Sequence, residues 1–269
     1  MSTIDDPDAF VLGVDIDGVC GDHALAFRDV VAAERGIDPE TLPPQQTWNF
    51  HEWGLTDDDF DELHRRAILE HRMFATMPAI EGVAETLWRL SDAGVWIRLI
   101  THRLYANFGH AVAVADTVTW LDQVGIPYRD LCFLGRKPEV QADAYVDDAP
   151  HNIAELRRAG NPVIVFDQPY NRELDGLRAR TWVDVEELVI ELRLQRGEAV
   201  QGRLPVADGG VERLTGRVGR ADPRSSTRPP IGRLGGVVSG SRPTTSEDRA
   251  PPPVQIWQRW HRREAHNRS

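Results

Sequence analysis

A short apolar run that ends at two closely spaced carboxylates restricts the fold more than any other feature of the chain. Residues 10–14 (Phe-Val-Leu-Gly-Val) predict a strand that is buried on both faces. Asp15 and Asp17 follow this strand, and Gly18 allows the chain to bend there. Carboxylates this close repel each other unless a cation or a proton lies between them. The feature therefore predicts a parallel sheet with a charged site at one edge.

Strand-like and helix-like segments alternate along the chain up to about residue 197. The expected strands are 10–14, 95–100, 131–134, 144–146 and 162–166, and the expected helices are 23–35, 81–93, 107–124, 150–160 and 184–195. This alternation predicts an α/β fold with a doubly wound, mostly parallel sheet. In such sheets the ligand site lies at the carboxyl ends of the strands.

Residues 38–78 interrupt the alternation and are rich in acidic, histidine and aromatic residues. Thr56 is followed by three Asp residues, which is typical of a helix start. We expect a small helical cap, inserted after the first strand. Two interpretations remain open for Trp48, Phe50 and Trp53: they form the core of this cap, or one of them stacks on a nucleotide base.

Further polar residues stand where later strands are expected to end. Thr101 ends one strand, and Asp147 and Asp148 end another. Asp148 is either a functional carboxylate or the N-cap of the helix that begins at Pro150. Three or four carboxylates in one crevice, without a cysteine or histidine cluster, make an oxygen site that favours Mg²⁺ over zinc.

The chain offers few residues for a transition metal. Cys20 and Cys132 are its only cysteines, so they form neither a disulfide framework nor a four-ligand zinc site by themselves. His51, His64 and His71 have an irregular spacing, which favours surface histidines over a shared metal site. A reduced, cytoplasmic protein is the resulting expectation.

One lysine, Lys137, occurs among 31 basic residues. Such a bias is typical of a GC-rich coding sequence, which uses Arg wherever either cation is acceptable. A retained lysine then indicates a position that needs a compact ammonium, and chance is the alternative.

These residue types together are able to carry out phosphate chemistry. A carboxylate such as Asp15 is able to attack phosphorus and form an aspartyl phosphate. A second acid such as Asp17 protonates the leaving oxygen and then activates water. A hydroxyl and an ammonium, from Thr101 and Lys137, hold the other phosphate oxygens, while Mg²⁺ neutralises phosphate charge.

The chain resembles the haloacid dehalogenase-like superfamily over about residues 10–167. The four motifs of that superfamily match Val14-Asp15-Ile16-Asp17-Gly18-Val19, Leu99-Ile100-Thr101, Lys137 and Val146-Asp147-Asp148. The resemblance implies that Asp15 is the nucleophile and Asp17 the acid/base. It implies that Thr101 and Lys137 hold the substrate phosphate. The Mg²⁺ ligands that it implies are Asp15, Asp17 through its backbone carbonyl, Asp147 and Asp148.

Within this superfamily the chain resembles the 5′(3′)-deoxyribonucleotidase group of small 5′-nucleotidases. The supporting features are Asp22 after the first motif, the helical insert, Arg136-Lys137 ten residues before Asp147, and Val165-Phe166-Asp167-Gln168-Pro169-Tyr170-Asn171. The chain departs from the group pattern at His23 and at His102-Arg103, which leaves base and sugar preference open. Arg103 and Arg136 are possible substrate contacts.

Three functions compete on these grounds. The first is hydrolysis of (deoxy)nucleoside monophosphates, with the insert closing as a lid. The second is the same chemistry on another small phosphomonoester, such as a sugar phosphate. The third is a non-catalytic protein that binds a phosphate ligand, which would not need an acid/base at Asp17. A kinase is disfavoured because the chain has no Gly-rich loop ending in Gly-Lys-Ser/Thr.

Charge divides the chain into two unequal parts. Residues 201–269 hold 13 Arg and 6 acidic residues, a net charge of +7, so the total of −11 leaves −18 for residues 1–200. The acidic part argues against nucleic-acid binding by the catalytic domain, expected at 1–197. The composition of 198–269 predicts a disordered basic tail whose partner is unknown. From the acidic start of the chain we expect no signal peptide, and no apolar run is long enough for a membrane span.

Overall fold

The computed structural model describes residues 9–104 and 109–197. Within these residues six parallel strands form one sheet in the order β3-β2-β1-β4-β5-β6. The strands are β1 (Val11–Val14), β2 (Trp96–Thr101), β3 (Asp130–Phe133), β4 (Ala144–Asp147), β5 (Val163–Phe166) and β6 (Arg178–Ala179). The strand order reverses at β1, so the crevice for a ligand is expected at the carboxyl ends of β1 and its two neighbours.

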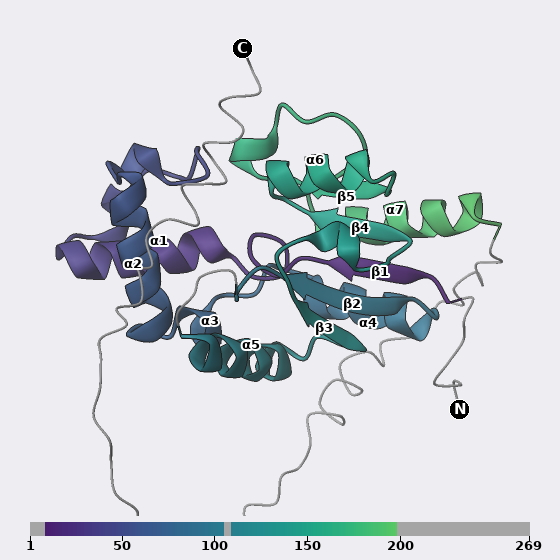
Figure 1. The fold of residues 1–269 in the computed structure, drawn as a ribbon, viewed down its shortest axis with the longest axis horizontal. Helices are drawn as coiled ribbons and strands as arrows, with labels where there is room; N and C mark the ends of the chain where they lie inside the picture. The colour runs from purple at the N-terminus through teal and green to yellow at the C-terminus, as the bar shows by residue number, and fades with distance from the viewer. Residues whose placement is uncertain (1–8, 105–108, 198–269) are drawn as a thin grey trace, which may run out of the picture. The chain divides into compact units, whose positions relative to one another are not determined.

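Helices cover the sheet and stand at its carboxyl edge (Figure 1). The α-helices are α1 (His23–Arg35), α2 (Asp57–Leu69), α3 (Met73–Thr76), α4 (Val83–Asp92), α5 (His110–Val124), α6 (Pro150–Arg158) and α7 (Trp182–Gln195). The 3₁₀ turns are η1 (Pro39–Thr41), η2 (His51–Trp53), η3 (Lys137–Glu139) and η4 (Pro169–Asn171). The doubly wound α/β fold expected from the sequence is confirmed.

Successive strand residues point to opposite faces, which gives the sheet two buried surfaces. On one face Leu12 packs in a cluster with Leu87 of α4 and Val185 of α7. On the other face Tyr145 packs with Leu156 of α6. Burial on both faces is what the continuous apolar strand segments predicted.

Element boundaries differ from the expected ones where caps or short segments decide them. Helix α7 begins at Trp182 rather than at residue 184, because the Thr181 hydroxyl accepts a hydrogen bond from the backbone N–H of Asp184. Strand β6 and helix α3 are too short to produce a periodic pattern, and the sequence did not predict them. The expected start of the helix at 107–124 lies partly outside the described residues.

The predicted insert at 38–78 holds η1, η2, α2 and α3, and α2 stands beyond the carboxyl ends of the strands (Figure 1). Thr56 caps α2 through a reciprocal pair of hydrogen bonds with Asp59, as its sequence indicated. Phe50 and Trp53 are buried against Phe27 of α1. These two rings therefore form part of the core of the insert.

No helix among the described residues is long and apolar enough to span a bilayer. The predicted basic tail at 198–269 lies outside the described residues, so it stays a prediction.

Candidate active site

Three adjacent strands bring their last residues to one edge of the sheet. Val14 of β1 lies in register with Leu99 of β2 and with Val146 of β4. Asp15 continues this register, because its backbone N–H donates to the carbonyl of Val146 at 3.0 Å. Thr101 and Asp147 end the neighbouring strands, so parallel pairing alone places the predicted motifs together.

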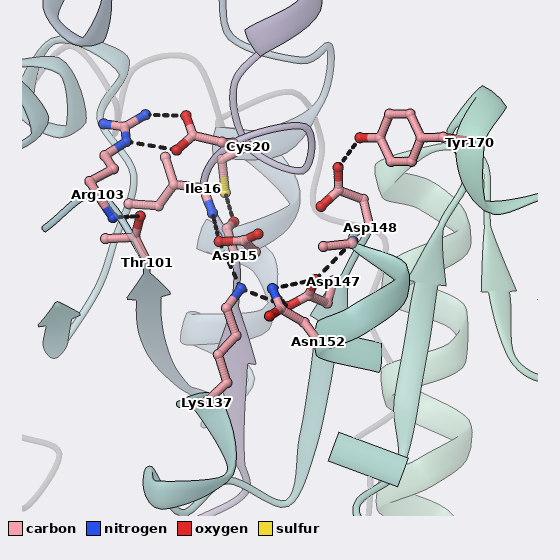
Figure 2. A network of polar contacts seen from close by, with 12 residues as sticks. Asp15, Ile16, Cys20, Thr101, Arg103, Lys137, Asp147, Asp148, Asn152 and Tyr170 are labelled. Carbon is pink, nitrogen blue, oxygen red and sulfur yellow. Dashed lines mark hydrogen bonds and ion pairs between the residues drawn. The ribbon is translucent and has the colours of Figure 1, made fainter. Parts of the chain in front are cut away.

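Asp15 lies at the centre of this edge, with 11% of its side chain exposed. Its Oδ1 accepts the backbone N–H of Ile16 at 2.8 Å and lies 2.9 Å from Lys137 Nζ. The thiol of Cys20 donates to the Asp15 carbonyl at 3.1 Å. Backbone and side chain are therefore both held, which fixes the carboxylate beside the ammonium of Lys137 (Figure 2).

Lys137 begins η3 and reaches the same edge with 2% of its side chain exposed. Its Nζ lies 2.6 Å from Asp147 Oδ2 and bridges Asp147 to Asp15. Burial alone would lower the pKa of Lys137, but the charges of Asp147 and Asp15 outweigh it and raise this pKa above its ordinary value. The lone lysine is therefore a buried, permanently charged group between two carboxylates.

Asp147 is fixed more firmly than the other carboxylates, and its side chain is 1% exposed. Besides Lys137, its Oδ1 accepts the backbone N–H of Ala149 at 3.0 Å and the side-chain amide of Asn152 at 3.3 Å. The N-cap residue of α6 is Ala149. The alternative of Asp148 as the cap of this helix is therefore wrong, because its carboxylate turns to the hydroxyl of Tyr170 instead.

Charge is out of balance in this cluster, since three buried carboxylates face one ammonium. Burial raises the pKa of Asp15 to about 7, with the charge of Asp147 adding to the shift and Lys137 opposing it. Burial, together with the charges of Asp15 and Asp147, raises the pKa of Asp148 well above its usual range. The cluster therefore needs a bound proton or a further cation.

The donor set fits a divalent cation. Asp15, Asp147 and Asp148 each offer a ligand oxygen, and these atoms all lie within 4.8 Å of one another. Asp148 Oδ1 is buried and has no hydrogen-bond partner, an arrangement that a cation would satisfy. All the donors are carboxylate oxygens, which suit a hard ion such as Mg²⁺.

Asp17 does not join this group of carboxylates. Its two oxygens face Arg103, with Oδ2 at 3.0 Å from Nε and Oδ1 at 2.7 Å from Nη2. Burial would raise the pKa of Asp17, but the charge and hydrogen bonds of Arg103 lower it to about 2. In this state the predicted acid/base is an ionised carboxylate in a two-pronged ion pair.

Arg103 is held on three sides and its side chain is 1% exposed. Its Nη1 donates to Thr117 Oγ1 at 2.8 Å, and its guanidinium lies 4.0 Å from the ring centre of Phe74. Its backbone N–H donates to Oγ1 of Thr101, which is itself buried, at 3.3 Å. The predicted substrate contact Arg103 is therefore bound to the predicted acid/base, directly beside the predicted phosphate ligand Thr101.

This ion pair predicts an asymmetry in stability. Asp17→Ala should destabilise the protein by about 3 kcal/mol or more, since it leaves a buried guanidinium without its anion. Arg103→Met should cost less, because the remaining carboxylate is 28% exposed and is able to hydrate. Urea unfolding of the two variants and the double variant measures both costs, and an equal or reversed order would contradict the argument.

Arg136 lies apart from the carboxylates. Its side chain is 61% exposed, and its guanidinium lies 2.8 Å from Glu155 and 3.6 Å from Glu139. Its predicted role as a substrate contact stays a prediction.

His64 is half-buried, which differs from the sequence interpretation of the insert histidines as surface residues. Nε2 of His64 lies 3.2 Å from Nε2 of His23, and the His64 ring stacks on Phe60. Burial lowers the pKa of His64 to about 3 and also lowers that of His23. The sequence marked His23 only as a departure from the group pattern, and nothing in it indicated the contact with His64, because α1 and α2 meet only in the folded protein. His51 is 57% exposed, as expected.

Three further residues at the site were not predicted as site residues. Asn152 donates a hydrogen bond to Asp147, and Cys20 donates one to the carbonyl of Asp15. Tyr170 donates one to Asp148. The position of Asn152 in the first turn of α6, five residues after Asp147, was a weak indication that the two side chains lie close together. Tyr170 lay in a segment that supported the family resemblance, but nothing in its spacing indicated contact with Asp148.

Comparison with known proteins finds a sequence family and a relative that resemble this chain. The sequence model of the family "5′ nucleotidase, deoxy (pyrimidine), cytosolic type C protein" matches residues 9–195. A protein of Chlorobaculum tepidum, provisionally named a 5′(3′)-deoxyribonucleotidase, is 45% identical over 184 residues, which cover 67% of this chain and 90% of that protein.

Solved structures of haloacid dehalogenase-like hydrolases also resemble the chain. One from Geobacter sulfurreducens has a TM-score of 0.44 and 17% identity, and covers 67% of this chain and 99% of its own. One from Streptococcus pneumoniae has a TM-score of 0.45 and 12% identity, and covers 68% of this chain and 100% of its own.

Proposed function

Because the chain belongs to the cytosolic type C family of 5′-nucleotidases, we propose that it hydrolyses (deoxy)nucleoside monophosphates through an aspartyl phosphate on Asp15, with Mg²⁺ as cofactor. Membership makes it a phosphatase of the 5′-nucleotidase kind. The substrate preference, the ion and the residue roles are the proposed part.

The observation that carries the proposal is the buried cluster of Asp15, Lys137 and Asp147 at the ends of adjacent parallel strands. The ammonium compensates part of the negative charge but leaves the carboxylates in excess. Such a site attracts a divalent cation and, with it, a phosphate dianion. Asp15, Asp147, Asp148 and the backbone carbonyl of Asp17 would hold Mg²⁺, which neutralises phosphate charge and so lets an anionic nucleophile approach.

The residues of the chain would then divide the reaction between them. A carboxylate oxygen of Asp15 attacks phosphorus, and the bond from phosphorus to the ester oxygen breaks. Asp17 gives its proton to the leaving oxygen, and later removes a proton from the water that attacks the aspartyl phosphate. Thr101 and Lys137 hold the phosphate oxygens throughout.

Arg103 constrains the order of these events. While both its prongs hold Asp17, that carboxylate stays ionised and is unable to donate a proton. We propose that the substrate phosphate competes for the Arg103 guanidinium and frees Asp17 to take up a proton. This would make Arg103 a substrate contact, as its position in the sequence suggested.

The domain arrangement follows from the same proposal. Residues 1–197 would form the catalytic domain in the cytoplasm, with the insert at 38–78 as a lid that excludes water and selects the substrate. The tail at 198–269 would take no part in the chemistry.

Phosphate release from a panel of nucleoside monophosphates and sugar phosphates, with and without Mg²⁺, tests the proposal. We expect Mg²⁺-dependent release from nucleotides. Release from sugar phosphates alone would support the same mechanism with a different substrate, which is the second candidate function. Absence of release from every compound, in a protein that still binds phosphate, would support the non-catalytic alternative.

Mg²⁺ should stabilise the protein more as pH rises. Because the pKa of Asp15 is raised to about 7, this carboxyl is protonated below neutral pH in the metal-free protein and ionised above it. The ion competes with those protons, so the gain in Tm on adding Mg²⁺ should be small at pH 5 and large at pH 8. The gain, rather than Tm itself, is the quantity to compare, because the lowered pKa of His64 by itself makes the protein more stable as pH rises through the range of an ordinary histidine. A gain that is constant with pH would contradict the charge argument.

A further inference from the structure

We propose that Tyr170 is the positioning residue for Asp148 in the cation site, and that Trp48 of the insert holds Tyr170 in place. The proposal rests on the proposed function, because it takes Asp148 to be a cation ligand. It goes beyond the proposed function because it links the insert, through Trp48 and Tyr170, to a carboxylate of the cation site.

The first step is the contact between Tyr170 and Asp148. The phenol hydroxyl donates a hydrogen bond to Asp148 Oδ2 (Figure 2). The other oxygen, Oδ1, is buried without a hydrogen-bond partner. The phenol therefore satisfies one oxygen and leaves the second available in the group formed with Asp15 and Asp147.

The turn at Gly18 closes the remaining side of this contact. A Cβ atom at Gly18 would lie 2.1 Å from Asp148 Oδ2 and 3.2 Å from the Tyr170 hydroxyl, and φ of Gly18 is +78°. The carboxylate and phenol thus pack directly on the backbone that follows the proposed nucleophile. Asp148 has little freedom to choose another rotamer while Tyr170 is in place.

The backbone around Tyr170 is anchored to the same two loops. Asn171 Nδ2 donates to the carbonyls of Asp148 and Phe166, both at 2.8 Å. Gln168 Nε2 donates to the carbonyl of Gly18 at 2.8 Å. Turn η4 is therefore tied to both strand ends that carry the carboxylates, and so is able to hold a side chain with the precision that a cation site needs.

The second step is the contact from the insert. Trp48 lies between η1 and η2, and its ring meets the Tyr170 ring edge to face, with ring centres 5.1 Å apart and an angle of 87°. The same ring meets His151 at the start of α6, at 5.3 Å and 88°. Trp48 thus joins the insert to α6 and η4. Loss of this ring should loosen the phenol and, through it, Asp148.

Mn²⁺ serves as the probe, since the electron paramagnetic resonance signal of the free ion reports the bound fraction without turnover. In the full-length protein we expect Tyr170→Phe to weaken Mn²⁺ binding about tenfold, as for other residues that orient a ligand. Activity should recover as Mg²⁺ is raised, with kcat at saturating Mg²⁺ within a few-fold of wild type. Tyr145→Phe is the matched control, because its hydroxyl bonds the Val140 carbonyl instead of a carboxylate.

Trp48→Leu should weaken Mn²⁺ binding less than Tyr170→Phe, and the double variant should resemble Tyr170→Phe alone. Equal Mn²⁺ affinity in wild type and Tyr170→Phe would overturn the role of Tyr170 and leave the proposed function standing. Fully additive losses in the double variant would overturn the role of Trp48. Absence of Mn²⁺ binding in wild type would instead refute the cation site of the proposed function.

Discussion

Asp15→Asn should lower kcat by at least about 10⁴-fold, because the variant keeps the shape of the side chain and loses the nucleophile. The fold should survive. Asp15 is a nearly buried carboxyl whose pKa is raised to about 7, so ionising it costs stability in the metal-free protein at pH 8. A neutral amide removes that cost, and the metal-free variant should be at least as stable as wild type at this pH.

Phosphate release and thermal unfolding in EDTA measure the two effects in the same protein samples. Asp143→Asn is the matched control, since Asp143 precedes β4 at the opposite end of the sheet, where it bonds Val11 and Arg196. Its turnover should stay close to wild type. Wild-type protein quenched in acid during turnover should carry phosphate on the peptide that contains Asp15. Turnover by Asp15→Asn at a normal rate would remove Asp15 from the mechanism.

Lys137→Arg should lower kcat by about 10²-fold or more although it preserves the charge. The ammonium has 2% exposure and fits between Asp147 at 2.6 Å and Asp15 at 2.9 Å. A planar guanidinium is larger and directs its donors in a fixed fork, so it is unable to occupy that space without moving a carboxylate. Steady-state kinetics at saturating Mg²⁺ separates this loss from a change in cation affinity.

Lys137→Met distinguishes charge from shape at the same position. It leaves buried carboxylates without their ammonium, so the metal-free protein at pH 8 should lose about 3 kcal/mol or more of stability. Mg²⁺ should restore part of that loss, whereas Lys137→Arg should retain most of its stability without Mg²⁺. Normal turnover in Lys137→Arg would mean that the single lysine of the chain is incidental to catalysis.

Much of the fold could be predicted because it rests on local patterns. The apolar runs at β1, β2 and β5 indicated strands, and glycines and caps marked the ends of the helices between them. Short elements escaped prediction, as β6 and α3 hold too few residues for a period to show. The start of α7 was misplaced because a capping hydrogen bond, rather than hydrophobic spacing, sets it.

The sequence by itself determined which residues meet at the candidate site along the strands. Asp15, Thr101 and Asp147 each end a strand of one parallel sheet, and parallel strands present their carboxyl ends at one edge. Lys137 was indicated by its rarity among the basic residues. These inferences needed only the strand ends and the chemistry of each side chain.

The tertiary structure alone decided which side chains touch. Asp17 pairs with Arg103 across 86 residues, and Tyr170 with Asp148 across 22. The rotamers at these positions depend on contacts with other elements. Phe74 packs against the guanidinium of Arg103, and Gly18 packs against the carboxylate of Asp148. Strand register places a Cα at an edge, but the direction of a long side chain is set by packing among elements that meet only after folding.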